Sequence, residues 1–283
     1  MSARSEIGAV VPVYNSERSV EAVVRGFLAF ADDAGISCRV VLVDDKSTDR
    51  STEILDRMAM ADGRVTAVHL SQNSGQQAAL LCGLALAAGD CRYLLTMDDD
   101  LQHPVQVAGQ LYARIQEGYD LVYAIPYGEE RPLCRKAGSL LRDILFSLCI
   151  AKPRGVRVSS FRMMTAELAQ KICAEHRQFV YLSASAFRYT PKTANLFYRQ
   201  QKRAYGSSGY SLRKLAGVYG NLFRYYTVPG ALFCPKEQGA PYQIASIVER
   251  GGCYGETDGS RRFQLPEERA DCRAQAWTSN RPD

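Results

Sequence analysis

The stretch IGAVVPVYNSERSVEAVVRGFLAFA, residues 7–31, joins two hydrophobic periods and decides the expected fold. Its first seven residues form a continuous apolar run rich in β-branched side chains, which is typical of a strand buried on both faces. From Val20 to Ala31 the apolar residues return at intervals of three and four, the spacing of one helix face. A buried strand followed by an amphipathic helix is the unit from which parallel α/β sheets are built.

The same alternation continues through the first half of the chain. Strands are expected at residues 39–43, 65–70, 93–97 and 120–125, and helices at 54–58, 78–86 and 105–116. This order predicts an α/β fold with a doubly wound, mostly parallel sheet flanked by helices. In such sheets ligands bind at the carboxyl ends of the strands.

Beyond the last of these strands the alternation weakens, and from about Cys234 the composition becomes rich in glycine and mixed charge without a clear period. We therefore expect a single domain over residues 1–232. Residues 233–283 are expected to form a short, irregular C-terminal appendage of unknown order.

Composition excludes several classes of protein. The 283 residues are 46% hydrophobic and 23% charged, which excludes a disordered chain. A net charge of +5 is too small for a dedicated nucleic-acid binder. Apolar runs fall short of the ~20 residues of a membrane-spanning helix, and the start of the chain does not look like a secretory leader. Nine cysteines without a CxxC pair fit neither a disulfide framework nor a zinc site, so we expect reduced thiols and a cytoplasmic location.

The strongest local signal is MDDDLQHP, residues 97–104, directly after an expected strand. In an extended segment side chains alternate, so Asp98 and Asp100 should project to one side and Asp99 to the other. With the carbonyl of Gln102 they offer hard oxygen ligands for Mg²⁺ or Mn²⁺. Acidic triplets are also common at strand ends, so the segment taken alone fits a solvated acidic loop better, and only the polar residues at the other strand ends favour the metal.

Polar residues also follow the first two expected strands, at 14–15 and at 44–49. Asp45 could accept hydrogen bonds from a base or a ribose, and Tyr14 could stack on the base. Each has a simpler interpretation, Tyr14 as a turn aromatic and Asp45 or Asp49 as a helix cap. Since the carboxyl ends of parallel strands meet at one edge of the sheet, we expect these clusters to converge on one crevice.

Taken together, VPVYN (11–15), VDDKS (43–47), NSG (73–75) and MDDDLQHP (97–104) resemble the family 2 inverting glycosyltransferases of GT-A fold. The last segment is similar to that of the polyprenyl-phosphate sugar transferases within the family. SFRM (160–163) and RAYGSSGYSL (203–212) resemble two later motifs of the same group. The resemblance runs over residues 6–226.

The resemblance implies roles for individual residues. It implies that the donor nucleotide contacts Pro12, Tyr14, Val43 and Asp45. It implies that Asp98, Asp100 and Gln102 hold Mg²⁺ or Mn²⁺ on the donor diphosphate, and that the catalytic residues are Asp98, Asp100 and Arg203. Phosphate or acceptor contacts are implied for Arg135, Arg162, Arg203, Ser207 and Tyr210.

The chain departs from the family pattern at several positions. Lys46 stands where the family usually has glycine, and Pro126 with Tyr127 stands where an arginine often binds phosphate. Arg131 or Arg135 could supply that charge instead. Gly209 occupies a place that is lysine in some members.

Residues 188–214 contain seven basic residues, no acidic ones and five aromatics. We favour a loop that faces a phospholipid or a diphosphate over a solvated basic face with buried tyrosines, and over a surface for nucleic acid. The amphipathic stretch at 140–150 fits a core helix and an interfacial helix equally well. His103 could act as a base, and a structural role in the turn before Pro104 is as good an interpretation.

The resemblance implies a transferase that moves a sugar from a nucleoside diphosphate to a polyprenyl phosphate. The implied location is peripheral, at the cytoplasmic face of the membrane, with no nucleic-acid partner; assembly into a homo-oligomer is left open. One alternative keeps the fold and metal and uses a saccharide hydroxyl as acceptor, in the synthesis of cell-surface polysaccharide. The other is a catalytically impaired protein that binds nucleotide sugars.

Overall fold

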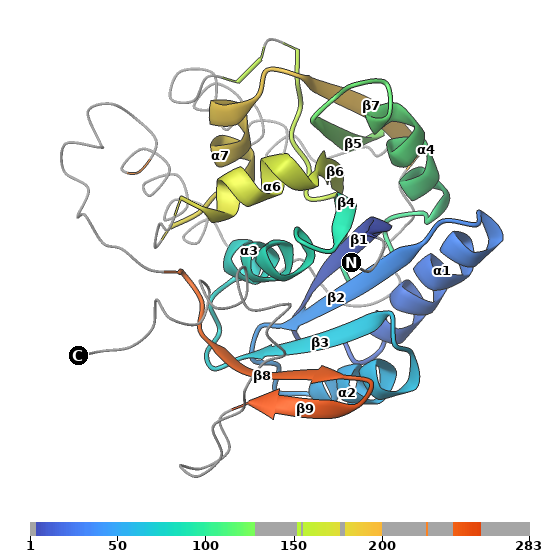
Figure 1. The fold of residues 1–283 in the computed structure, drawn as a ribbon, viewed down its shortest axis with the longest axis vertical. Coiled ribbons are helices and arrows are strands. Elements are labelled where there is room, and N and C mark those ends of the chain that lie inside the picture. The colour runs from blue at the N-terminus through green and yellow to red at the C-terminus, as the bar shows by residue number, and fades with distance from the viewer. Residues whose placement is uncertain are drawn as a thin grey trace.

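The computed structural model describes residues 4–127, 152–153, 155–175, 179–199, 225 and 240–255. These residues contain a nine-stranded mixed sheet in the order β7-β5-β6-β4-β1-β2-β3-β8-β9, with helices on both faces (Figure 1). The strands are β1 (Ser5–Val13), β2 (Cys38–Asp44), β3 (Val65–Leu70), β4 (Cys91–Thr96), β5 (Leu121–Tyr127), β6 (Arg162–Thr165), β7 (Thr193–Arg199), β8 (Ile244–Glu249) and β9 (Gly252–Gly255). The predicted α/β fold with a mostly parallel sheet is confirmed.

The centre of the sheet is parallel. Strand β1 pairs in parallel with β2 and with β4, and β2 pairs in parallel with β3. Strand β6 lies antiparallel between β4 and β5, so β5 and its parallel neighbour β7 run in the same direction as β4. The carboxyl ends of all these parallel strands therefore lie at one edge of the sheet.

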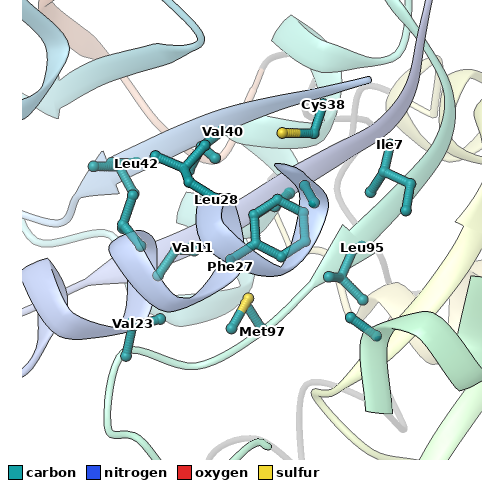
Figure 2. Close-up of a cluster of buried hydrophobic side chains, with 14 of the residues drawn as sticks. Ile7, Val11, Val23, Phe27, Leu28, Cys38, Val40, Leu42, Leu95 and Met97 are labelled. Atoms are coloured by element: carbon teal, nitrogen blue, oxygen red, sulfur yellow. The ribbon is translucent and has the colours of Figure 1, made fainter. Parts of the chain in front are cut away.

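Each face of the sheet is covered by three of the described helices (Figure 1). One face packs against α1 (Val20–Asp33), α2 (Ser51–Ala61) and α4 (Gln106–Ile115); the other packs against α3 (Gln76–Ala87), α6 (Ala166–Cys173) and α7 (Leu182–Tyr189). In Figure 2 Phe27 of α1 lies over Val11 and Leu95 of the sheet. Burying one such side chain contributes about 1.5–3 kcal/mol, so these layers hold the strand ends in place.

Helix α3 lies unusually close to the sheet. A Cβ atom at Gly83 would come within 2.3 Å of Val10 Cγ1 and 3.1 Å of Val43 Cγ2. Only a residue without a side chain permits this approach, which brings the start of α3 beside the ends of β1 and β2.

Two strands that the sequence did not predict come from the segment 233–283. Strand β8 pairs antiparallel with β3, and β9 pairs antiparallel with β8 (Figure 1). Neither segment shows the clear alternation of apolar and polar residues that marks a strand, so these strands are recognised only from their pairing in the sheet. The predicted domain boundary after residue 232 and the amphipathic stretch at 140–150 lie outside the described residues. No helix within the described ranges is long and apolar enough to cross a membrane.

Candidate functional site

Hydrogen bonds join the loops that follow β1, β2 and β4. The Asn15 amide donates to Ser47 Oγ at 3.0 Å, and the Thr48 amide donates to Asn15 Oδ1 at 2.7 Å. Asp99 accepts from the hydroxyl of Ser16 and from the Tyr14 amide. The three polar clusters therefore meet at one edge of the sheet, as the sequence predicted.

Asp45 anchors the start of α3 to the end of β2. Its side chain is 4% exposed, and its two oxygens accept hydrogen bonds from the amides of Ser74 at 2.6 Å and Gly75 at 2.8 Å. Burial raises the pKa of Asp45, and the two amide hydrogen bonds oppose the rise. Asp45 therefore holds the residues just before α3 and does not cap the helix that follows it in the chain, whereas Asp49 accepts from the Ser51 amide at the start of α2 at 3.0 Å.

The other residues assigned to the nucleotide are placed differently. Pro12 and Val43 are opposite each other in the sheet and are buried, and the Val43 side chain packs against α3. Tyr14 is half exposed at the rim, where an aromatic ring is open to a ligand.

Lys46 has a left-handed backbone, with φ of 63°. Only glycine adopts this region without steric cost, which explains why glycine suits this position in the family that the chain resembles. The lysine keeps the loop geometry at a cost of about 1 kcal/mol.

Asp98 is held by three donors from three segments. Gln76 Nε2 donates to Oδ1 at 2.7 Å, Ser160 Oγ donates to Oδ2 at 2.7 Å, and His103 Nε2 lies 3.1 Å from Oδ2. Burial disfavours the charged carboxylate, but hydrogen bonds from His103 and Ser160 and the nearby charge of Arg162 outweigh it and lower the pKa of Asp98. Asp98 therefore stays ionised and ties β4, α3 and the start of β6 together.

His103 has a structural position. Its side chain is 6% exposed, its Nδ1 lies 2.9 Å from the hydroxyl of Tyr198, and its ring lies 4.3 Å from that of Phe161. Because Asp98 and Tyr198 occupy both ring nitrogens, the structural interpretation of His103 fits better than the interpretation as a base.

Asp99 and Asp100 complete the acidic segment. Asp99 points to the loop after β1, away from the partners of Asp98; burial raises the pKa of Asp99 to about 6. The Gln102 amide donates to Asp100 Oδ1 at 3.1 Å. Strand β4 ends at Thr96, before the acidic segment, and Asp99 faces away from the partners of Asp98 as expected.

The oxygens of Asp100 and Gln102 suit Mg²⁺ or Mn²⁺ in chemistry. The described residues contain no group of three or more His, Cys, Asp and Glu side chains arranged to hold a metal ion. Mg²⁺ is commonly held by only one or two carboxylates together with substrate phosphates and water, so the donor set fits that mode of binding.

Arg162 lies in the interior. It is 2% exposed, its Nη1 donates to Ser183 Oγ at 2.8 Å, and its guanidinium lies 5.9 Å from the ring centre of Tyr123. Its Nε and Nη2 find no hydrogen-bond partner among the described residues. In this structure Arg162 stands behind Asp98 and is not open to a phosphate.

The remaining residues assigned to phosphate or acceptor lie outside the described residues: Arg135, Arg203, Ser207 and Tyr210. Sequence reasoning missed Gln76 as a partner of Asp98 because nothing in its local pattern marks it, and it placed Ser160 in the SFRM motif without assigning it a role. It did not single out His69, although a histidine at an inward position of a buried strand is a detectable signal.

A family model described as Glycosyl transferase family 2 matches residues 9–173. Two curated relatives have the same name, undecaprenyl-phosphate 4-deoxy-4-formamido-L-arabinose transferase. The one from Salmonella paratyphi A is 26% identical over 77% of this chain and 66% of its own length. The one from Pseudomonas aeruginosa is 32% identical over 76% of this chain and 63% of its own length. The chain thus matches slightly less than two thirds of either relative.

Solved structures share the fold. Mannosyl-3-phosphoglycerate synthase from Rubrobacter xylanophilus superposes with a TM-score of 0.56 at 16% identity, over 89% of this chain and 87% of its own. Glucosyl-3-phosphoglycerate synthase from Mycobacterium tuberculosis, solved in complex with Mn²⁺, UDP-glucose and phosphoglyceric acid, gives 0.53 at 19% identity over 78% of each chain. At these identities the likeness establishes the fold, which is the GT-A fold.

Proposed function

The chain belongs to glycosyl transferase family 2, and we propose that it is an inverting enzyme that moves a sugar from a nucleoside diphosphate to a polyprenyl phosphate. The observation that carries the acceptor is the similarity to two transferases whose names specify undecaprenyl phosphate. The donor follows from the family and from the three polar loops that converge at the carboxyl edge of the sheet.

The nucleotide is proposed to bind at the carboxyl ends of β1 and β2, where Pro12 and Val43 are paired. Tyr14 is half exposed beside it and can stack on the base. The carboxylate of Asp45 retains acceptor capacity beyond its bonds to Ser74 and Gly75, and the backbone near it is held rigid for a ribose or base contact.

The divalent ion is proposed to bind Asp98, Asp100 and Gln102. Asp98 accepts hydrogen bonds from Gln76 and Ser160, so in this site it both offers a carboxylate and fixes the position of the acidic segment. When bound, Mg²⁺ or Mn²⁺ would neutralise the negative charge that develops on the departing nucleoside diphosphate. Asp98 keeps the segment in place through its ties to α3 and to the start of β6.

In the proposed reaction an oxygen of the acceptor phosphate forms a bond to the anomeric carbon of the sugar. The bond from that carbon to the β-phosphate oxygen breaks, its electron pair leaves with the nucleoside diphosphate, and the anomeric configuration inverts. A phosphate is already ionised near neutral pH, so no side chain has to remove a proton. Arg135, Arg203, Ser207 and Tyr210 are proposed to contact phosphate or acceptor, and the enzyme is proposed to act at the cytoplasmic face of the membrane as a peripheral protein.

The test measures transfer of radiolabelled sugar from UDP- and GDP-sugars in the presence of Mn²⁺. One reaction contains undecaprenyl phosphate in detergent and a parallel reaction contains an oligosaccharide. We expect product only with the lipid phosphate, and none with the Asp100→Asn variant. Asp33→Asn, at an exposed position at the end of α1, is the matched control and should retain activity.

Product with the oligosaccharide alone would refute the acceptor and leave the donor chemistry standing. Binding of nucleotide sugar without turnover on either acceptor would instead favour an impaired binding protein. Thermal shifts with the same nucleotide sugars distinguish that outcome from a protein that binds none, since a ligand that binds only the folded state raises the apparent stability.

A further inference from the structure

His69 lies near the end of β3, on the face of the sheet that carries α2, and carboxylates meet both of its ring nitrogens. Nδ1 lies 3.2 Å from Asp44 Oδ2, and Nε2 lies 2.8 Å from Asp56 Oδ1. An ionised carboxylate only accepts hydrogen bonds, whereas a neutral imidazole donates from one nitrogen and accepts at the other. Both contacts are satisfied only when the ring carries two protons, so the geometry requires an imidazolium.

The charges around the ring are consistent with this state. Strand β2 contributes Asp44, which is almost fully buried, and helix α2 contributes Asp56, which is a third exposed. Strand β8 places the uncharged Ser246 opposite His69 in the sheet. Burial disfavours the cation, but the two carboxylates outweigh burial and raise the pKa of His69.

Asp44 connects this cation to the loop after β2. Its Oδ1 accepts from the Ser47 amide at 2.9 Å, and its Oδ2 accepts from Thr52 Oγ1 at 2.7 Å. Burial opposes the charge on Asp44, but hydrogen bonds from His69, Ser47 and Thr52 lower its pKa to about 2. Ser47 in turn accepts from Asn15, so the contacts run from Asp56 through His69 and Asp44 to the loops after β2 and β1.

We propose that His69 is a positioning residue, an imidazolium clamped between Asp44 and Asp56 that holds the loop at residues 45–48 in the shape required for nucleotide binding. This inference rests on the proposed function, because it assigns that loop to the nucleotide. Loss of one ring proton places a nitrogen lone pair against either Asp44 or Asp56, so the ring can no longer hold both carboxylates and the clamp on the loop of Ser47 is weakened. Since the pKa of His69 is raised, the clamp is complete below the ordinary value near 6.5 and is lost as the pH rises through the raised value.

The first measurement needs no ligand. Nitrogen chemical shifts of the imidazole rings, assigned by comparison with His69→Gln, give the protonation of His69 between pH 6 and pH 9. We expect a doubly protonated ring at pH 7 and a fall in the titration midpoint in Asp56→Asn. Amide exchange of Ser47, corrected for its intrinsic pH dependence, should accelerate above the same midpoint. A neutral ring at pH 7, or an unchanged midpoint in Asp56→Asn, would overturn the proposal.

The second measurement is calorimetric titration with UDP and with GDP over the same pH range. Dividing the wild-type affinity by the His69→Gln affinity at each pH removes the effect of the nucleotide's own titration. We expect this ratio to be about fivefold or more at pH 6.5 and to fall toward one above the titration midpoint of His69. Glu53→Gln, an exposed residue on α2, is the control and should follow the wild type. A constant ratio overturns the positioning role. If neither nucleotide binds at any pH, the result counts against the proposed function. The nitrogen shifts of His69 and the amide exchange of Ser47 still test whether His69 is clamped, because they need no ligand.

Discussion

Replacing Asp98 or Asp100 by asparagine should have different consequences, although the two residues belong to one motif. Asparagine retains one oxygen and replaces the other with a donor. At Asp98 that donor must face either Gln76 Nε2 on one side or His103 and Ser160 on the other, and all three are donors to the carboxylate. The least costly orientation still loses one hydrogen bond to a charged acceptor and leaves two donors facing each other.

The magnitude follows from this arrangement. A hydrogen bond to a charged group contributes about 1.5–3 kcal/mol, and the remaining two bonds weaken when their acceptor becomes neutral. The side chain of Asp98 is 25% exposed, so water offsets part of the loss. We expect Asp98→Asn to lower the free energy of unfolding by about 2–3 kcal/mol. For Asp100→Asn the amide oxygen can still accept from the Gln102 backbone amide, so this bond is kept and we expect the smaller loss of the two variants.

Urea unfolding followed by circular dichroism measures both changes, and the sugar-transfer assay measures function. Transfer should be lost in both variants, whereas only Asp98→Asn should shift the urea midpoint strongly. Because the pKa of Asp98 is lowered, its contribution is present at neutral pH and is lost only as the pH falls below its ordinary value of 3.8. Equal destabilisation by the two variants would refute the structural role of Asp98, and full transfer activity in Asp100→Asn would refute the metal assignment.

Three further predictions concern packing, backbone and cysteine chemistry. Gly83→Ala places a Cβ 2.3 Å from Val10 Cγ1 and should lower stability by about 1–3 kcal/mol in urea unfolding; an unchanged midpoint would contradict the close approach of α3. Lys46→Gly should raise stability by up to about 1 kcal/mol in the same assay, since glycine accepts a φ of 63° without strain, and a loss would count against that backbone. Iodoacetamide at pH 8 should label the exposed Cys253 well before Cys91, because burial raises the pKa of Cys91 to about 12. Peptide mass spectrometry measures the order of labelling, and faster labelling of Cys91 would contradict this prediction.

Much of the fold was predictable because its signals are local. The third strand was predicted at 65–70 and is found at Val65–Leu70, and the other elements of the first half differ by a few residues at their ends. The spacing of apolar residues along a strand or helix is a local property, so it can be recognised in a single sequence. Strands β6 to β9 and helices α6 and α7 were not predicted. Strands β6, β7 and β8 pair with partners far away in the sequence, β4 and β5, β5, and β3 respectively, while β9 pairs with its neighbour β8.

The candidate site was predictable in its location and less so in its contacts. The convergence of the loops after β1, β2 and β4 follows from parallel strand order alone. The different surroundings of Asp98 and Asp100, and the burial of Arg162, could not be predicted, because neighbouring residues in a motif can face different environments once the strand has ended.

The sequence by itself determined the family, the alternation of strands and helices, and the edge of the sheet where the polar loops meet. Only the tertiary structure decided that Asp98 is tied to Gln76, His103 and Ser160, and that His69 stands between two carboxylates. The physical reason is the range of the interactions. Hydrophobic period and strand order act along the chain, whereas a hydrogen bond or an ion pair exists only when folding brings two distant side chains to within about 3 Å.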